Sequence, residues 1–544
     1  MPPTRRNFLQ QLAALGLIAP TTHAQQMGDM HDHGLHNTKQ IPSASMAPIA
    51  LAQKPLLRPE LLTPYVDPLP IPQRARPISA THPHKLRIPM REVHAKIHRD
   101  VPATRMWSYG DDALAPLIEA RSGQALEIEW VNHLPTQHFL PIDYSLHGCG
   151  HDVPDVRACV HLHGGRTPSA DDGQPDDWYV PGKSRIHKYP LQQDATALWY
   201  HDHAMGLNRL NIYAGLYGMA IVRDSTEDAL HLPSGKYEVP LLLCDREITQ
   251  DGQLLYYESG IPDHPWVSEF AGRCLLVNGK LKPFLDVEPR PYRFRVLNAA
   301  NSSFFTLNLT DQHSFHQIGS DQGLLSTPLE LQRQTIAPAE RLDLIIDFSN
   351  LDGQNIEMLN GFLPFLQFRV AHVDSSTKPA TNLPTALRSI TRTPESSAIL
   401  TRTITLNEAL DHIGNSMLMV LNYKRWHEPV TEKPKLNTTE IWEFVNLTED
   451  THPMHLHLVR FQVLDRRTFD VFDYRNGKGK RYISGPMPPG PGEGGWKDVV
   501  QCPPGVITRI IVHFDGYPGN YLYHCHILEH EANDMMRPFE VVAS

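Results

Sequence analysis

The stretch Tyr523-His524-Cys525-His526 carries the most information about this chain, and His530 and Met535 follow it closely. The stretch is predicted to be a strand, and neighbouring side chains of a strand point to opposite faces. The sulfur of Cys525 would therefore point away from the imidazoles of His524 and His526. One strand can then serve two metal sites, one on each face.

The cysteine face has the ligand types of a blue copper centre, which are a thiolate, two imidazoles and a weakly bound thioether. Cys525, His530 and Met535 come from one segment of the chain, and His452 would supply the second imidazole. This face therefore predicts a mononuclear copper site.

The opposite face is predicted from a set of His-x-His pairs. One such pair is weak evidence, because a polar strand face looks the same. Here two pairs in the first third of the chain are echoed by two pairs in the last third, and eight imidazoles suit three copper ions. The eight are His161, His163, His201, His203, His455, His457, His524 and His526. Asp202 stands between His201 and His203, at the position that corresponds to Cys525 between His524 and His526. A blue centre is therefore expected only near the C-terminus.

Three stretches about 150 residues apart indicate a threefold internal repeat. Residues 126–132, 292–298 and 440–446 each alternate apolar and polar residues, as half-buried strands do, and each ends in a polar turn. The chain also has 47 prolines among 544 residues, above the usual ~5%, which disfavours long helices. Many short strands joined by Pro/Gly turns predict an all-β fold of three Greek-key β-sandwich domains.

These patterns divide the chain into six segments. A Pro-rich stretch precedes the first domain, and a Ser/Thr/Pro-rich stretch separates the second domain from the third. The predicted segments are a signal peptide at 1–24, a lead-in at 25–80, domains at 81–225 and 226–375, a linker at 376–398, and a last domain at 399–544.

The N-terminus predicts export. Paired arginines, Arg5 and Arg6, precede an apolar run over 12–19 and a small-residue cleavage signal at 22–24, which is the layout of a twin-arginine signal peptide. We expect a periplasmic or otherwise exported bacterial protein that uses the twin-arginine export machinery. The His- and Met-containing start of the mature chain, residues 27–36, is interpreted as a disordered tail, with weak copper capture as the alternative.

Charge and hydropathy exclude two classes of partner. The 50 basic and 60 acidic residues give a net charge of −10, so nothing favours nucleic-acid binding. After the signal peptide no run of 18 or more apolar residues predicts a membrane span. The expected partners are a small-molecule reductant and dioxygen, and the expected state is a monomer.

The motifs resemble those of the multicopper oxidases, and most closely the branch of bacterial spore-coat laccases and bilirubin oxidases. The resemblance covers about residue 50 to the C-terminus. It rests on the segments 524–531 and 534–538, on 161–165 and 201–205, and on 317–321 in the middle domain. It implies three cupredoxin-like domains and a laccase-like activity, in which one-electron oxidation of phenols, aminophenols or bilins is coupled to four-electron reduction of dioxygen to water.

Carried over residue by residue, the resemblance implies four copper ions per chain, one of type 1, one of type 2 and two of type 3. His452, Cys525 and His530 would bind type 1 copper with Met535 as axial ligand; Met536 is the alternative, and its spacing from Cys525 is less favourable. His161 and His455 would bind type 2 copper. The type 3 pair would take His163, His201, His203, His457, His524 and His526.

Three residues are expected to act in catalysis. Cys525 would pass electrons through His524 and His526, and Asp172 and Glu531 match acids of the resembled branch that would deliver protons. For Asp172 the alternative is a solvated carboxylate in an acidic loop. For Glu531 the alternative is hydrogen bonding that orients a copper ligand.

Two other functions compete with this interpretation. A metal-ion oxidase acting on Cu(I) or Mn(II) would share the copper sites. The dedicated cuprous enzymes carry a Met-rich insert near the type 1 site, and this chain has only scattered methionines there, such as Met417, Met419 and Met487, which weakens this alternative and leaves it open. A copper-binding scaffold without activity is disfavoured by the complete set of ligands.

Five cysteines remain besides Cys525, namely Cys149, Cys159, Cys244, Cys274 and Cys502, and an exported protein allows disulfides. Cys149 can pair with Cys159, and Cys244 can pair with Cys274. Because five is odd, at least one cysteine stays free or pairs between chains.

Overall fold

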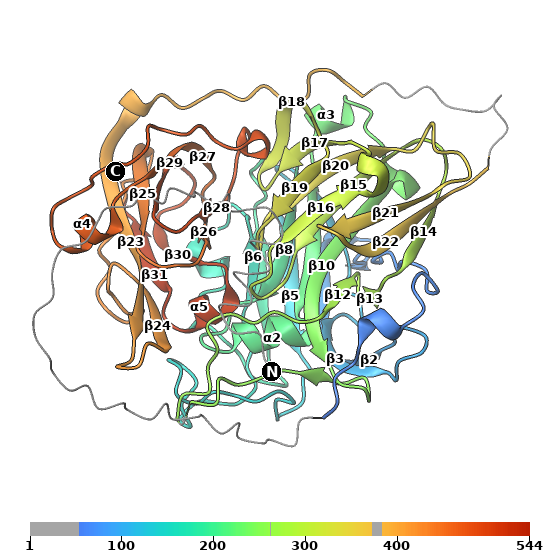
Figure 1. The fold of residues 1–544 in the computed structure, drawn as a ribbon, viewed down its shortest axis with the longest axis horizontal. Coiled ribbons are helices and arrows are strands. Elements are labelled where there is room, and N and C mark those ends of the chain that lie inside the picture. The colour runs from blue at the N-terminus through green and yellow to red at the C-terminus, as the bar shows by residue number, and fades with distance from the viewer. Residues whose placement is uncertain (1–53, 262, 373–382, 544) are drawn as a thin grey trace, which may run out of the picture. The chain divides into compact units, whose positions relative to one another are not determined.

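The computed structural model describes residues 54–261, 263–372 and 383–543, which form one compact unit of short strands. The predicted signal peptide and the His/Met tail lie outside the described residues. Six sheets form three successive β-sandwiches, and the longest described α-helix, α2 (Asn208–Ala214), has only seven residues. The predicted all-β fold is therefore confirmed, whereas the exact domain boundaries stay a prediction (Figure 1).

The first sandwich pairs a five-stranded and a four-stranded sheet. The five-stranded sheet runs β1 (Pro77–Ser79), β2 (His82–Ala95), β5 (Leu126–Asn132) and β7 (Ser184–Tyr189), with β3 (Thr104–Tyr109) on β2. The four-stranded sheet runs β4 (Ile118–Arg121), β9 (Tyr217–Arg223), β8 (Thr196–Asp202) and β6 (Val160–His163). Before it, the lead-in makes isolated bridges to the first and middle sandwiches, such as Arg74 with Leu117 and Pro68 with Phe284.

The middle sandwich is the largest of the three. One sheet runs β13 (Lys280–Leu281), β12 (Cys274–Val277), β10 (Glu238–Ile248), β15 (Pro291–Asn298), β20 (Arg341–Asp347), β17 (Phe315–Ser320) and β18 (Gly323–Leu331), with β11 (Leu254–Leu255) on β10. The other runs β14 (Phe284–Val287), β22 (Leu363–Val370), β21 (Asn355–Asn360), β16 (Phe305–Leu309) and β19 (Arg333–Ile336).

The last sandwich resembles the first in size. One sheet runs β24 (Ser416–Leu421), β23 (Ala398–Leu410), β25 (Thr438–Asn446), β29 (Val506–Phe514) and β27 (Phe461–Thr468). The other runs β28 (Val499–Cys502), β26 (His452–Leu456), β30 (Gly519–Cys525) and β31 (Met536–Val541). The remaining short helices are α3 (Ser225–Asp228), α4 (Val471–Arg475), α5 (Leu528–Ala532), and the 3-10 turns η1 (Pro59–Leu61), η2 (Ser169–Asp171), η3 (Gly235–Tyr237), η4 (Thr310–Gln312), η6 (Glu395–Ser397) and η7 (Pro491–Glu493).

The threefold repeat is confirmed by strand pairing. β5, β15 and β25 each lie parallel to an earlier strand and antiparallel to a later one, namely β2 and β7, β10 and β20, and β23 and β29. Each of the three also ends in an asparagine whose side-chain oxygen accepts from the backbone N–H two residues later. These distances are 3.0, 2.9 and 2.8 Å for Asn132, Asn298 and Asn446. The same strand end is thus built three times.

The expectation that these strands are half-buried is wrong for β25, where only Thr438 is not buried, and for β15, where every residue is buried. Arg293 and Arg295 point to the polar face of the alternation, but they are covered there by Glu238 and Asp343, with Arg293 Nε 2.9 Å from Asp343 Oδ1 and Arg295 Nε 2.8 Å from Glu238 Oε1. Ion pairs make this burial tolerable, since a buried charge without a partner is costly.

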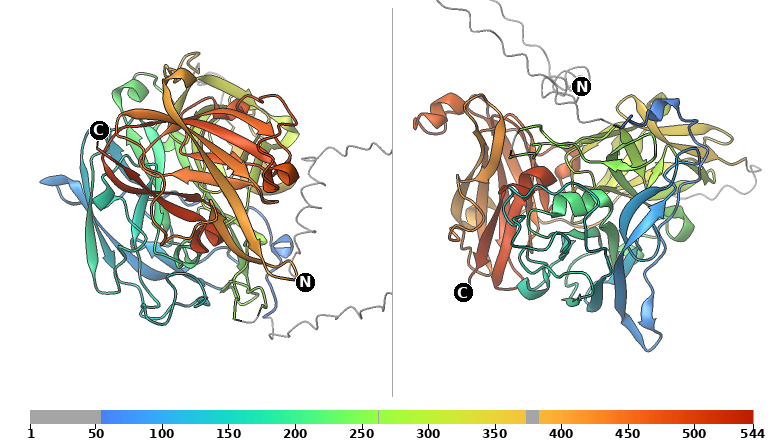
Figure 2. Two further views of the ribbon diagram at one scale, coloured as in Figure 1. Left: turned by 90° about the vertical axis from the view of Figure 1, so that its left-hand side faces the viewer. Right: turned by 90° about the horizontal axis from the view of Figure 1, so that it is seen from below.

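The first and last sandwiches share one apolar core, which includes Trp199 and Tyr200 of β8 as well as Met454 and Tyr523 of β26 and β30. In both views of Figure 2, the orange-to-red last sandwich packs against the green-to-teal strands of the first. Strands β6, β8, β26 and β30 consequently meet in the middle of the molecule (Figure 1). This junction is where the four His-x-His pairs lie.

Candidate metal centre

The eight histidines of the predicted cluster converge between the first and last sandwiches. Each is at most 1% exposed. The strands β6 and β8 set His161 opposite His201, and β26 and β30 set His455 opposite His524. Across the junction the ring of His161 stacks on His457, with centroids 3.9 Å apart, and His163 stacks on His455 at 3.7 Å. Side chains separated by some 300 residues in the sequence therefore share one buried space.

Most of these imidazoles are anchored through Nδ1, which leaves Nε2 free to bind a metal ion. His161, His201 and His455 donate Nδ1–H to backbone carbonyls at 2.6, 2.9 and 2.8 Å, and their Nε2 atoms are buried without a hydrogen-bond partner. A buried lone pair without a partner is unfavourable. A bound cation would satisfy each of the three.

The contact between His457 and His524 also indicates a bound cation. His524 donates Nδ1–H to the carbonyl of Cys525 at 3.0 Å, and His457 Nδ1 lies 2.8 Å from a carboxylate oxygen of Asp172. With a proton on each Nδ1, both Nε2 atoms carry lone pairs, yet they face one another at 3.2 Å. Neither can donate to the other, so a cation bound by both would relieve the contact.

His163 is oriented in the opposite sense. Its Nε2 lies 3.2 Å from Asp498 Oδ1, and its Nδ1 is the buried nitrogen without a partner. His203 and His526 have no hydrogen bond on either ring nitrogen. Burial lowers the pKa of seven cluster histidines, to about 3 for His203, so that these imidazoles are neutral and able to coordinate; the seven are His161, His163, His201, His203, His455, His457 and His526.

Ligand atoms of these residues lie close enough to hold several ions. The triplets whose ligand atoms all lie within 4.8 Å of one another include His161 with His163 and His201, His161 with His455 and His457, and His203 with His457 and His524. Imidazole nitrogens are good ligands for copper. The donor set therefore fits the copper that the sequence predicts.

The other face of β30 carries a second, smaller site. The sulfur of Cys525 lies 3.5 Å from His452 Nδ1 and 3.6 Å from His530 Nδ1, and all three side chains are fully buried. The outer nitrogens are held in place, His452 Nε2 by the hydroxyl of Thr448 at 2.6 Å and His530 Nε2 by Glu269 at 3.3 Å. The three inward atoms form the thiolate and two-imidazole set of a blue copper centre.

The structure separates Met535 from Met536. The backbone carbonyl of Met535 accepts from the N–H of Cys525 at 3.1 Å, and its side chain lies in the same core cluster as Cys525. Met536 begins β31 opposite His524 and packs instead with Met205 and Leu522. Because residues opposite one another on paired strands share a face, Met536 lies on the face of His524, and Met535 stays the predicted thioether ligand of the cysteine face.

Both predicted acids lie against the histidine cluster. Asp172 is 1% exposed and contacts two of the histidines, His457 and, at 3.5 Å from its Oδ1, His161. Burial raises the pKa of Asp172 well above its ordinary value. The alternative of a solvated loop carboxylate is therefore wrong.

Glu531 is fully buried and also contacts two of the histidines, His203 at 3.4 Å and His524 at 3.2 Å. It accepts a hydrogen bond from Asn208 of α2 at 2.6 Å, because α5 lies beside α2 (Figure 1). These contacts suit both proton transfer and the orientation of ligands.

Asp202 shows why the first sandwich has no thiolate site. Its carboxylate accepts from the backbone N–H groups of Cys159 and Ala204 at 3.0 and 3.1 Å, and from the side chain of Asn211 at 2.8 Å. Burial raises its pKa to about 7. The position that holds Cys525 in the last sandwich is thus occupied by a hydrogen-bonded structural carboxylate.

Sequence reasoning missed three residues that hold the ligands, namely Glu269, Thr448 and Asp498. Glu269 and Asp498 are brought to their histidines from 261 and 335 residues away, so no local motif reveals them. Thr448 had a detectable signal, because it follows the strand-ending Asn446 by two residues and lies just before His452.

The structure also decides whether the two predicted disulfides form. All six cysteines are buried and free, so neither Cys149 with Cys159 nor Cys244 with Cys274 forms a disulfide. The Cys159 thiol instead contacts the carbonyl of Gln174 at 3.1 Å, and Cys244 contacts the hydroxyl of Tyr217 at 3.1 Å.

Comparison with known proteins gives one consistent answer. Two family models described as multicopper oxidase match residues 91–227 and 393–544. The chain is 43% identical to a laccase of Bacillus subtilis over 88% of this chain and 98% of that protein, and 34% identical to a laccase of Haloferax volcanii over 99% and 91%. Among solved structures it resembles a multicopper oxidase of Aquifex aeolicus, with 27% identity, a TM-score of 0.72, and coverage of 88% of this chain and 100% of that one.

The two faces of β30 predict separable metal losses. We expect Cys525→Ser to lose the intense visible absorption of a Cu(II)–thiolate bond, while the histidine cluster on the other face keeps its copper. Absorption spectra and copper analysis of the purified protein measure this. Cys274→Ser, a buried free thiol on β12 of the middle sandwich, is the matched control and should keep its colour. Full colour in Cys525→Ser would contradict the assignment.

Proposed function

The chain belongs to the multicopper oxidase family, and from this premise we propose that it is a laccase that oxidises phenols, aminophenols or bilins. The family and the laccase relatives support a copper-dependent oxidase that uses dioxygen as acceptor. The observation that carries the proposal is the complete pair of sites on opposite faces of β30. The eight histidines of one site, and His452, Cys525 and His530 of the other, are all present and buried.

We propose that His452, Cys525, His530 and Met535 hold one type 1 copper. We further propose that the eight cluster histidines hold one type 2 and two type 3 coppers, four ions in all. When bound, the copper ions accept single electrons from a donor and reduce dioxygen to water. The backbone of β30 joins Cys525 directly to His524 and His526, so only covalent bonds separate the two sites.

The side chain of Glu269 marks where an electron donor would dock. His530 is fully buried, but Glu269, whose carboxylate contacts its outer nitrogen, is one-third exposed. A donor that reaches Glu269 is therefore one side chain away from the cysteine site. The carboxylate oxygens can accept a proton from a phenol or an aminophenol as it loses an electron.

Protons for water formation would come from the buried acids. Burial raises the pKa of Asp172 well above its ordinary value, which favours the protonated form, and its Oδ2 lies 2.8 Å from the Nδ1 of His457. Glu531 contacts a different pair of the histidines, His203 and His524. We propose that both carboxyl groups deliver protons into the space between the histidines.

Location and assembly remain proposals from the sequence. We propose that the paired arginines direct export by the twin-arginine machinery and that the exported protein is a monomer. Within the described residues, no helix has the length and apolar character needed to cross a bilayer. Retention of Arg5→Lys/Arg6→Lys protein in the cytoplasm would support the export route, and unchanged export would contradict it.

Dioxygen uptake by the copper-loaded protein tests the proposed donor class. We expect faster uptake with a phenol or a bilin than with Cu(I) or Mn(II). Faster uptake with a metal ion would replace the proposal by a metal-ion oxidase, and binding of copper without any uptake would replace it by a scaffold.

Replacing the buried acid predicts a loss in the dioxygen half of the reaction. Asp172→Asn keeps the shape of the side chain but removes the proton that it can give up, and general acid catalysis contributes about 10²–10⁴-fold. We expect dioxygen reduction to slow by at least tenfold, while anaerobic bleaching of the blue band by a donor keeps its rate. Asp176→Asn, an exposed carboxylate of the same acidic run, is the control. Equal rates in both variants would contradict the role.

Replacing Glu269, the partly exposed acid, is predicted to slow oxidation of the donor and to leave the reaction with dioxygen unchanged. Glu269→Gln keeps a polar atom beside His530 but removes the proton acceptor. We expect slower anaerobic bleaching with phenols, an effect that shrinks as pH rises and the phenol ionises by itself, whereas reoxidation by dioxygen is unchanged. The bleaching rate measured against pH checks this. An unchanged pH profile would exclude Glu269 as the acceptor.

A further inference from the structure

A glycine-containing loop of the last sandwich docks onto the middle sandwich beside the histidine cluster. A Cβ atom at Gly492 would lie 2.5 Å from the side-chain oxygen of Gln317, and one at Gly495 would lie 2.8 Å from the hydroxyl of Ser320. Ser320 also donates to the carbonyl of Trp496 at 3.0 Å. The missing side chains allow this close approach, which delivers the next two residues, Lys497 and Asp498, into the interior.

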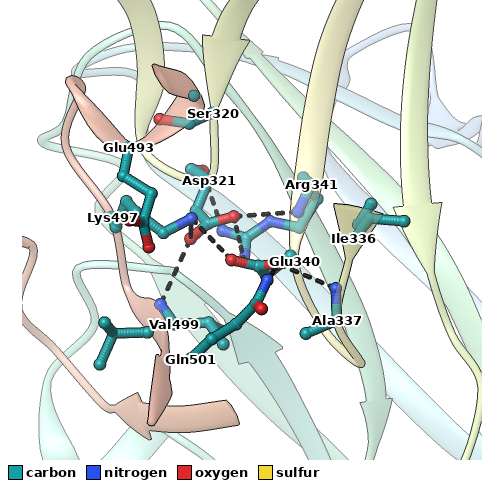
Figure 3. A network of polar contacts seen from close by, with 12 residues as sticks. Ser320, Asp321, Ile336, Ala337, Glu340, Arg341, Glu493, Lys497, Val499 and Gln501 are labelled. Carbon is teal, nitrogen blue, oxygen red and sulfur yellow. Dashed lines mark hydrogen bonds and ion pairs between the residues drawn. The ribbon is translucent and has the colours of Figure 1, made fainter. Parts of the chain in front are cut away.

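Lys497 is clamped by acids of the middle sandwich (Figure 3). Its ammonium group lies 2.9 Å from Asp321 Oδ2 and 2.9 Å from Glu340 Oε1, and the lysine side chain is only 4% exposed. Glu340 also accepts from the side chain of Gln501 at 2.7 Å. These contacts fix the loop, because a buried ammonium group would be costly in any position without them.

Asp498 is held by the middle sandwich in the same way. Arg341 donates through both terminal nitrogens to its carboxylate, with Nη1 2.7 Å from Oδ1, and Gln322 donates to Oδ2 at 2.6 Å. Arg341 is held in turn by the carbonyls of Asp321 and Ala197, at 2.9 and 3.0 Å. A bidentate guanidinium fixes both the position and the plane of a carboxylate.

The fixed carboxylate reaches two histidines of the cluster. Asp498 Oδ1 accepts from His163 Nε2 at 3.2 Å, and its backbone carbonyl accepts from His455 Nδ1 at 2.8 Å. A proton held on Nε2 leaves Nδ1 as the metal-binding nitrogen of His163, whereas the anchored imidazoles described above offer Nε2. Asp498 thus accounts for the reversed orientation of this one ligand.

We infer that Asp498, held by Arg341 and Gln322, is a positioning residue that sets which nitrogen His163 offers, and that the middle sandwich thereby controls copper binding in the histidine cluster. None of the predicted ligands comes from the middle sandwich, so its part in the histidine cluster is to lock this carboxylate. The inference rests on the proposed copper centre.

Copper binding by the full-length protein tests the inference. The variants are Asp498→Ala, Asp498→Asn and Arg341→Lys, with Asp465→Ala as control, since Asp465 forms a comparable bidentate pair with Arg509 in the last sandwich. Copper per chain after dialysis against a chelator, the type 2 signal in electron paramagnetic resonance, the blue absorption, and thermal unfolding of the metal-free protein are measured.

We expect Asp498→Ala to bind copper in the cluster about 10–100-fold more weakly, the range typical of residues that orient metal ligands. The blue absorption should persist, because the described hydrogen bonds of His452, Cys525 and His530 with other side chains join them to one another, to Thr448 and to Glu269. Arg341→Lys keeps the positive charge but loses the two-pronged guanidinium contact with the carboxylate. It should therefore lose less copper than Asp498→Ala and show an altered type 2 signal. The control should keep all its copper.

Full copper content and unchanged resonance signals in both Asp498→Ala and Arg341→Lys would overturn the inference. Loss of copper in proportion to a lowered unfolding temperature, in the control as well, would also overturn it, since that shows only general destabilisation. If Asp498→Ala does not fold, Arg341→Lys and Asp498→Asn decide by the same criteria. A parent protein that binds no copper would instead contradict the proposed function.

Discussion

The alternation of side chains along β30 is the constraint on which the metal centre depends. Cys525 ends β30 between His524 and His526, whose rings lie 5.3 Å apart in the histidine cluster, and its sulfur faces His452 and His530 on the other side. A thiolate site and an imidazole site are therefore built back to back, with only covalent bonds between them.

This constraint explains the architecture around the strand. The imidazole face needs partners that β30 cannot supply, and the first sandwich supplies four of them on β6 and β8. The two sandwiches share one apolar core, so that histidines distant in sequence are fixed with their rings stacked. The first sandwich has no thiolate site of its own. At the position that corresponds to Cys525 it has Asp202, whose carboxylate accepts three hydrogen bonds. The middle sandwich completes the centre through Arg341 and Asp498.

The sequence was sufficient for the fold and for the candidate ligands, because both depend on short-range spacing. The three alternating stretches predict β5, β15 and β25, and the His-x-His pairs predict which side chains share a strand face. The groups that anchor the ligands could not be predicted. Asp498 and Glu269 reach their histidines only after the sandwiches pack together. The prediction that β15 is half-buried was wrong for the same reason, because acids from other strands cover the face that carries Arg293 and Arg295.

The ratio of donor oxidised to dioxygen consumed tests most directly whether the two faces of β30 work as one enzyme. It is measured with a one-electron phenolic donor, with an assay for hydrogen peroxide in the same reaction. If electrons from the cysteine face are gathered in the histidine cluster, four donor molecules are oxidised per dioxygen and no peroxide appears. Two donor molecules per dioxygen, with peroxide released, would contradict the account, because dioxygen would then be reduced without the joint action of the cluster.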